Sequence, residues 1–134
     1  MSQPLRVLHV IPSISPLRGG PSKAVLDMVG ALRQRGVDAS ILTTNDHGPG
    51  VDASLPTGKW IDRQGNPLIA FPRWSPPVHA LREFAFSPGL VRWLNVHLRD
   101  YDLLHVHAIF SFPSTWAMRQ ARHADVPYLV RTIG

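Results

Sequence analysis

The chain contains no cysteine, which excludes disulfide bonds and thiolate metal sites and fits a reducing compartment. It has no apolar run near the ~20 residues that a bilayer-spanning helix needs. The start of the chain, MSQPLRVLHVI, lacks the basic residues, long apolar stretch and small-residue cleavage site of a signal peptide. We therefore expect a cytoplasmic protein.

Blocks of like charge are also missing, although the formal net charge is +5. The arginines are scattered along the chain, which is typical of a solvated basic surface. The same charge allows peripheral contact with acidic lipid headgroups, or binding of phosphorylated substrates. Because no recognition motif accompanies the charge, we do not expect the chain to bind nucleic acid.

What the sequence does contain is a strand, a paired-glycine loop and a helix at its start. Residues 5–11 are apolar on both faces, as in a buried parallel strand. A helix is expected at 21–35, where apolar residues recur every three or four positions. Gly19 and Gly20 precede it, so the backbone there can approach a ligand closely. The free N–H groups of the helix end favour an anion such as phosphate.

Strand and helix patterns alternate through the rest of the chain. Residues 45–77 are rich in glycine and proline and are interpreted as a long surface loop, with a small hairpin near Trp60. We expect further strands at 37–44, 68–71, 102–108 and 127–133, and helices at 79–86, at 88–99 and from Ser111 onward.

This alternation predicts an α/β fold, a Rossmann-like three-layer sandwich with a mostly parallel sheet. The expected strand order is 3-2-1-4-5, and we expect the fold to be truncated after the fifth strand. The whole chain, residues 1–134, would then form one partial domain. Ligands of such folds bind where the strand order reverses, at the carboxyl ends of the first and fourth strands.

Two segments meet at that point, one after each strand. We expect the diglycine bend at Gly19 and Gly20 and the strand end bearing His107 to border one crevice. Three side chains next to the bend could donate to a phosphate or an acidic acceptor: Arg18, Ser22 and Lys23. On the other side, His107 is a candidate sugar ligand. Ser111 is either an acceptor contact or a helix cap.

Histidines stand two apart in the fourth strand. His105 and His107 therefore point to the same face of the sheet, and His9 on the first strand could neighbour them. Three imidazoles raise the idea of a metal site. Because no carboxylate or further ligand is placed to complete such a site, we expect no metal and no cofactor.

Two long stretches resemble the N-terminal domain of the family-four glycosyltransferases, which have the two-domain GT-B fold. They read RVLHVIPSISPLRGGPSKAVLDMVGALRQRGVDASILTT and DLLHVHAIFSFPSTWAMRQARHADVPYLVRTIG. The resemblance implies retaining transfer of a sugar from a nucleotide-sugar donor, with the acceptor bound by this domain. It places Gly19 and Gly20 against the donor phosphates.

The chain departs from this family pattern in two places. We expect the C-terminal domain that holds the nucleotide sugar, with its basic pair and two glutamates, to be missing from this chain. Many relatives also read His-Gly where this chain has Ile133-Gly134. An isoleucine cannot donate a hydrogen bond to a sugar hydroxyl.

We therefore interpret the chain as the acceptor-binding part of a retaining glycosyltransferase, inactive alone. Its expected partners are a nucleotide sugar, a glycan or lipid-linked acceptor, and the missing donor-binding domain or a separate chain that supplies it. The alternative is a non-enzymatic single-domain α/β protein that binds a nucleotide or phosphorylated ligand. A third interpretation is an interaction module that pairs its open sheet edge with another chain.

Overall fold

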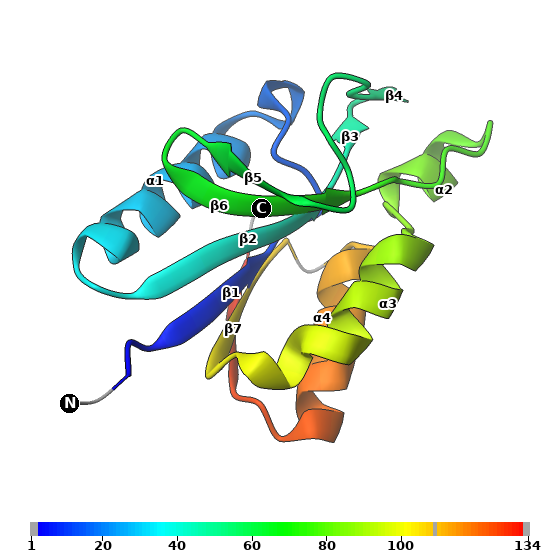
Figure 1. Cartoon of the computed structure of the whole chain (residues 1–134). Helices are drawn as coiled ribbons and strands as arrows, with labels where there is room; N and C mark the ends of the chain where they lie inside the picture. Colours follow the sequence, from blue (N-terminus) through cyan, green and yellow to red (C-terminus); the bar gives the residue numbers. More distant parts are fainter. Residues whose placement is uncertain (1–2, 109, 133–134) are drawn as a thin grey trace.

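The computed structural model describes residues 3–108 and 110–132. A twisted sheet of six strands forms the centre, in the order β5-β6-β2-β1-β7-β8 (Figure 1). The strands are β1 (Arg6–Val10), β2 (Asp38–Thr44), β5 (Trp60–Arg63), β6 (Asn66–Phe71), β7 (Leu103–His107) and β8 (Tyr128–Arg131). A separate two-stranded ribbon consists of β3 (Asp46–His47) and β4 (Gly50–Val51).

Helices cover both faces of this sheet. In Figure 1, α1 lies on one face, and α3 and α4 lie together on the other. The helices are α1 (Gly20–Gln34), α2 (His79–Glu83), α3 (Pro88–His97) and α4 (Phe112–Ala124), with short 3-10 turns at Pro16–Arg18 and Leu98–Asp100. The predicted Rossmann-like α/β architecture is therefore confirmed.

The sheet is parallel except at one edge. β1 pairs in parallel with β2 and with β7, β2 pairs in parallel with β6, and β7 with β8. With β6 as the third strand, this is the predicted order 3-2-1-4-5. The hairpin expected near Trp60 consists of β5 and β6. Strand β5 runs antiparallel to β6 and forms an outer strand of the sheet.

The segment 45–77 holds more regular structure than its composition suggests. β6 begins two residues before the predicted strand, because Asn66 and Pro67 pair with Arg63 and Asp62 in the hairpin. The first residues after β2 form the β3–β4 ribbon. At the other end of the chain, β8 is shorter than the predicted strand 127–133, and Ile133-Gly134 lies outside the described residues.

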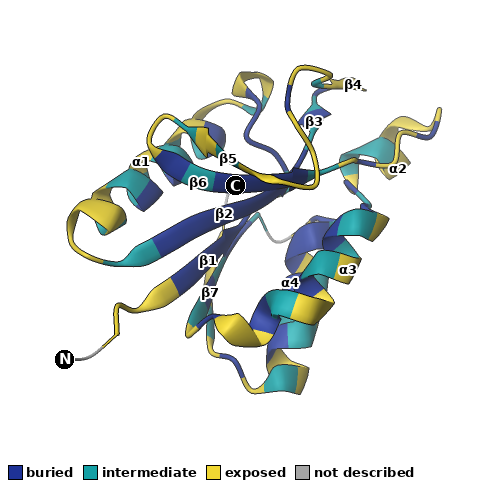
Figure 2. Cartoon of the chain, in the orientation of Figure 1, coloured by how far each residue is buried: buried dark blue, intermediate teal, exposed yellow. Residues whose placement is uncertain are grey.

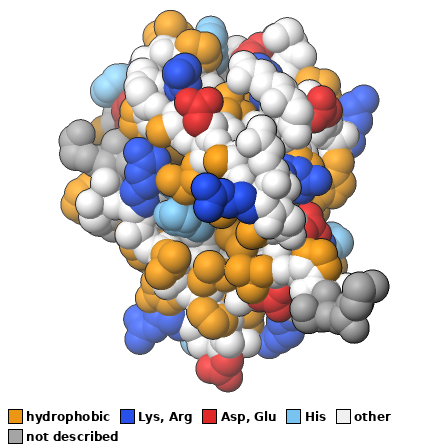
Figure 3. Space-filling view, turned by 90° about the vertical axis from the view of Figure 1, so that its left-hand side faces the viewer, with side chains coloured by type: hydrophobic (Ala, Val, Ile, Leu, Met, Phe, Trp, Pro, Cys, Tyr) orange, Lys and Arg blue, Asp and Glu red, His pale blue; other side chains and the backbone are white. Residues whose placement is uncertain are grey.

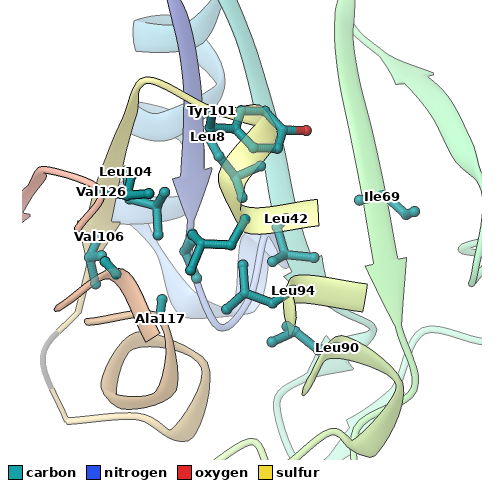
Figure 4. Packing of buried hydrophobic residues seen from close by; sticks show 13 residues of the cluster. Leu8, Leu42, Ile69, Leu90, Leu94, Tyr101, Leu104, Val106, Ala117 and Val126 are labelled. Atoms are coloured by element: carbon teal, nitrogen blue, oxygen red, sulfur yellow. The ribbon is translucent and has the colours of Figure 1, made fainter. Parts of the chain in front are cut away.

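A hydrophobic core fills the space between the sheet and helices α3 and α4. Buried strand side chains such as Leu8 and Val106 form one cluster with Leu90 and Leu94 of α3 and Ala117 of α4, and Val106 lies on the α4 side of it (Figure 4). Such residues alternate along a strand because successive side chains point to opposite faces of the sheet. α3 begins as the sequence predicts, because the Ser87 hydroxyl caps it by accepting from the Leu90 N–H at 3.5 Å.

On the opposite face, Val25 and Val29 of α1 pack against the sheet residues Ile41 and Leu68. Figure 2 shows that the central strands are buried while the outer turns and helix faces are exposed. The edge strand β8 differs from the buried central strands, because two of its hydrophobic side chains are exposed: Leu129 to 54% and Val130 to 40%. It is the open edge that the sequence predicts.

The surface carries charge of both signs. On the face shown in Figure 3, hydrophobic side chains are mixed with Lys or Arg, His and Asp or Glu side chains. The arginines do not gather there into one continuous basic patch, which agrees with their scatter in the sequence. None of the helices in the described part of the chain combines the length and the apolar character that crossing a bilayer requires.

The core makes a direct prediction for α3. Leu94→Ala removes a fully buried side chain and leaves a cavity, so the free energy of unfolding should fall by about 2–5 kcal/mol. Val96→Ala is the matched control, because Val96 lies on the same helix and is 74% exposed. Urea denaturation of both variants tests this; an equal effect of the two changes would contradict the packing described.

Candidate functional site

A pocket of about 210 Å³ lies at the carboxyl ends of β1, β2 and β7. One wall comes from the segment after β1, with residues 11–13, Arg18 and Pro21. The opposite wall comes from the segment after β7, with Ala108 and Ser111. The two segments that the sequence analysis places at the switch point therefore line the same pocket.

The diglycine bend joins the Pro16–Arg18 turn to α1. Gly19 has φ +79° and ψ −146°, a backbone conformation that essentially only glycine adopts. Gly20 is the first residue of α1, and a Cβ placed on it would meet nothing within 4 Å in the described chain. Among the described residues no side chain caps α1, so its first-turn N–H groups remain available beside the pocket.

Arg18 lies between two carboxylates at the pocket wall. Its guanidinium donates to both oxygens of Asp46, at 2.8 and 2.9 Å, and to Glu83 of α2 at 2.6 Å. The hydrogen bond to Asp46 is the main reason that the pKa of Arg18 is raised, so the cation is permanent. The Arg18 side chain nevertheless keeps 30% of its surface exposed.

Asp46 also binds a second arginine. The guanidinium of Arg73, which is completely buried, donates to Asp46 and to the carbonyl oxygen of Gly48. Burial alone would raise the pKa of Asp46, but the hydrogen bonds from Arg18, Ser13 and Arg73 lower it, so the carboxylate is ionised.

The sequence analysis missed Asp46, Arg73 and Glu83. One signal was available for Asp46: it follows the second strand, whose carboxyl end must lie beside the first in a parallel sheet. No pattern connects the other two to the pocket, because Arg73 follows β6 and Glu83 lies on a five-residue helix.

The other two predicted side chains near the bend, Ser22 and Lys23, differ in their relation to the pocket. The Ser22 hydroxyl is buried and donates to the carbonyl oxygen of Ser13 at 3.3 Å, which ties the start of α1 to the β1 loop. Ser22 also lines the pocket. Lys23 does not line it; its side chain is 83% exposed and contacts Asp27 one turn along α1.

Ser111 is the helix cap considered in the sequence analysis, and it also lies in the pocket wall. It caps α4 by accepting from the Ser114 N–H at 3.4 Å. Nearby, Ala108 has φ +65°, a left-handed conformation that is unusual for a residue with a side chain. Such strained positions cluster at binding and catalytic sites.

His107 lies just outside the pocket wall. Its side chain is fully buried, and its Nε2 lies 3.0 Å from Nδ1 of His9 in a hydrogen bond. Burial, with a contribution from the neighbouring His105, lowers the pKa of His9 to about 3. Burial also lowers the pKa of His107 to about 3, with contributions from the charges of His105, His9 and Arg131. Both rings are therefore neutral. The expected neighbourhood of His9, His105 and His107 is confirmed.

Comparison with known proteins identifies the family. Residues 19–133 match the family described as "Glycosyl transferase 4-like domain". The chain belongs to this family. The match confirms the resemblance to the N-terminal domain of family-four glycosyltransferases, and it covers both the diglycine bend and the β7–α4 segment.

One relative is the GDP-mannose:cellobiosyl-diphosphopolyprenol alpha-mannosyltransferase of Komagataeibacter xylinus. It is 33% identical over 121 residues, which cover 87% of this chain. The matched part is 28% of the relative, so the chain spans less than a third of that protein's length.

The Asp46 cluster makes a prediction about stability. Asp46→Asn leaves the buried guanidinium of Arg73 without its carboxylate, so the free energy of unfolding should fall by about 3–5 kcal/mol. Asp27→Asn serves as control, because it removes only the exposed contact with Lys23 and should change stability by ~0.5 kcal/mol or less. Urea denaturation at neutral pH measures both; a mild effect of Asp46→Asn would show that the cluster contributes little.

Proposed function

We propose that this chain forms the acceptor-binding part of a retaining glycosyltransferase. The acceptor is a glycan or a lipid-linked sugar, and the donor is a nucleotide sugar held by a further domain or a separate chain. The relative from Komagataeibacter xylinus acts, by its name, on a cellobiosyl-diphosphopolyprenol with GDP-mannose. We extend this to a diphosphate-linked lipid acceptor and a GDP-mannose donor for the present chain.

The position of Arg18 is the observation that carries this proposal. Its guanidinium is part of the pocket wall and is partly exposed. Since Asp46 is also held by Arg73, Arg18 can turn toward a ligand without leaving a buried carboxylate unpaired. Glu83 is 35% exposed and can be solvated when Arg18 leaves it. A phosphate of the acceptor would replace Glu83 as the partner of Arg18.

The start of α1 supports a second anion contact. No side chain of the described residues caps α1, and the N–H groups of its first turn carry the positive end of the helix dipole; Pro21 has no N–H, so those of Ser22 and Lys23 follow Gly20. We assign this position, with Gly19 and Gly20, to the donor phosphates. Binding there would stabilise the departing nucleotide diphosphate as the sugar is transferred.

The remaining candidates have smaller proposed roles. Ser111 borders the pocket and can hydrogen-bond a sugar hydroxyl. His107 is fully buried, so its proposed contribution to sugar binding acts through the strained residue Ala108 that follows it in the pocket wall. Lys23 is exposed near the start of α1 and can reach only a ligand that extends beyond the pocket.

A binding experiment tests the acceptor assignment. Arg18→Gln should weaken binding of a cellobiosyl diphosphate carrying a short prenyl chain roughly tenfold or more, because a charge-assisted hydrogen bond is lost. Arg35→Gln is the control, since Arg35 is exposed at the end of α1, away from the pocket. Isothermal titration calorimetry measures both variants.

Equal affinities of the two variants would contradict the role of Arg18. Binding of GDP-mannose by the chain without any binding of the acceptor probe would instead favour the nucleotide-binding alternative. These two failures are distinguishable because the titrations use different ligands.

The diglycine bend allows a paired test. Gly20→Val should leave the unfolding midpoint unchanged, because a side chain there meets open space in the chain, yet abolish transfer once a donor-binding part is supplied. Gly19→Val should lower stability by ~1–3 kcal/mol, since valine cannot adopt its backbone angles without strain. Thermal melts and a radiolabelled sugar-transfer assay measure the two effects; normal turnover of Gly20→Val would contradict the phosphate assignment.

A further inference from the structure

Three imidazoles lie together on one face of the sheet. His9 of β1 stands directly opposite His105 of β7 in the parallel register, and His107 lies two residues further along β7. Their neighbours in sequence, such as Leu8 and Val106, belong to the core under α3 and α4. The histidines therefore point to the other face, the one that α1 partly covers.

The distances between these rings suit a common ligand. The ring centroids of His9 and His105 are 4.9 Å apart, and those of His105 and His107 are 4.4 Å apart. One nitrogen from each histidine lies within 4.8 Å of the others. The closest two, Nδ1 of His9 and Nε2 of His107, are separated by 3.0 Å. Two nitrogens that bind one tetrahedral zinc ion are about 3.3 Å apart, so the closest pair already fits and the third ring must approach by about 1.5 Å at most.

Ring nitrogens without a partner also suit a metal. Two buried ring nitrogens, Nε2 of His9 and Nδ1 of His107, find no hydrogen-bond partner within the described residues. Such orphaned polar atoms are uncommon in a folded interior.

We propose that His9, His105 and His107 form a binding site for a divalent transition-metal ion, with Zn²⁺ the best-suited. Two histidines two apart on one strand and a third on the adjacent strand supply three ligands from a rigid support. The chain places no fourth protein ligand beside the three histidines, which is why the sequence predicts no metal. Three imidazoles suffice when water takes the fourth position, and the partly exposed His105 provides a path to solvent.

Arg131 modulates this site. It pairs with His107 in the register between β7 and β8, so its side chain leaves the sheet on the face that carries the three imidazoles. A cation close to the ligands opposes the binding of a second cation. Removing the charge of Arg131 should therefore strengthen metal binding, whereas a purely hydrophobic or packing role of the histidines predicts no such effect.

Metal titration of the chelator-treated chain tests the proposal. Calorimetry with ZnCl₂ should show one ion per chain, and Co²⁺ should give the visible absorption of a tetrahedral nitrogen site. His105→Gln, at a partly exposed position, should weaken binding roughly tenfold or more. His123→Gln is the control, because His123 is exposed on α4 and should leave the affinity unchanged. Arg131→Gln should bind more tightly than the unmodified chain.

The experiment still tests the proposal if variants of the buried histidines fail to fold. Absence of stoichiometric Zn²⁺ binding to the unmodified chain overturns the proposal. So does an equal loss of affinity in His105→Gln and His123→Gln, which would assign the metal to surface histidines. Neither result bears on the acceptor test at Arg18, because Arg18 lines the pocket and the three imidazoles do not.

Discussion

The position of β1 between β2 and β7 is the constraint on which the rest of the structure depends. Parallel pairing on both sides aligns the carboxyl ends of three strands at one edge of the sheet. The pocket lies at that edge, between the loops that leave β1 and β7. The same register brings His9 opposite His105. Any shift of β7 against β1 by one residue would move its histidines to the other face.

Charge at the pocket is organised around one buried carboxylate. Asp46 holds both Arg18, from the diglycine loop, and Arg73, from the end of β6. A buried ion pair of this kind adds little net stability compared with apolar packing, but it strongly restricts which arrangement the groups can adopt. Because Arg73 also binds Asp46, the carboxylate would stay paired if Arg18 turned away from it. The pocket wall thus combines a buried anion with a partly exposed cation.

Much of the fold was predictable, because its signals are local. The two-residue and 3.6-residue periods, with Ser87 as a helix cap, indicated the strands and helices, and the alternation indicated the strand order. The ends of the strands within 45–77 could be predicted only in part, since glycines and prolines there mark turns but do not show which strands pair with one another. The pairing of β5 with β6 extends the latter to Asn66, and this depends on a neighbour in space.

The site was predictable only in part, for the same reason. By itself, the sequence determined that a glycine pair precedes the first helix, that histidines on β7 share one face, and that the loops after β1 and β7 meet. Only the structure showed that the backbone angles of Gly19 require a glycine. Only the tertiary structure decided that Asp46 joins Arg18 to Arg73, because these residues lie 28 and 27 positions away from it. Hydrogen bonds between distant residues follow from strand order and loop conformation, which no local pattern encodes.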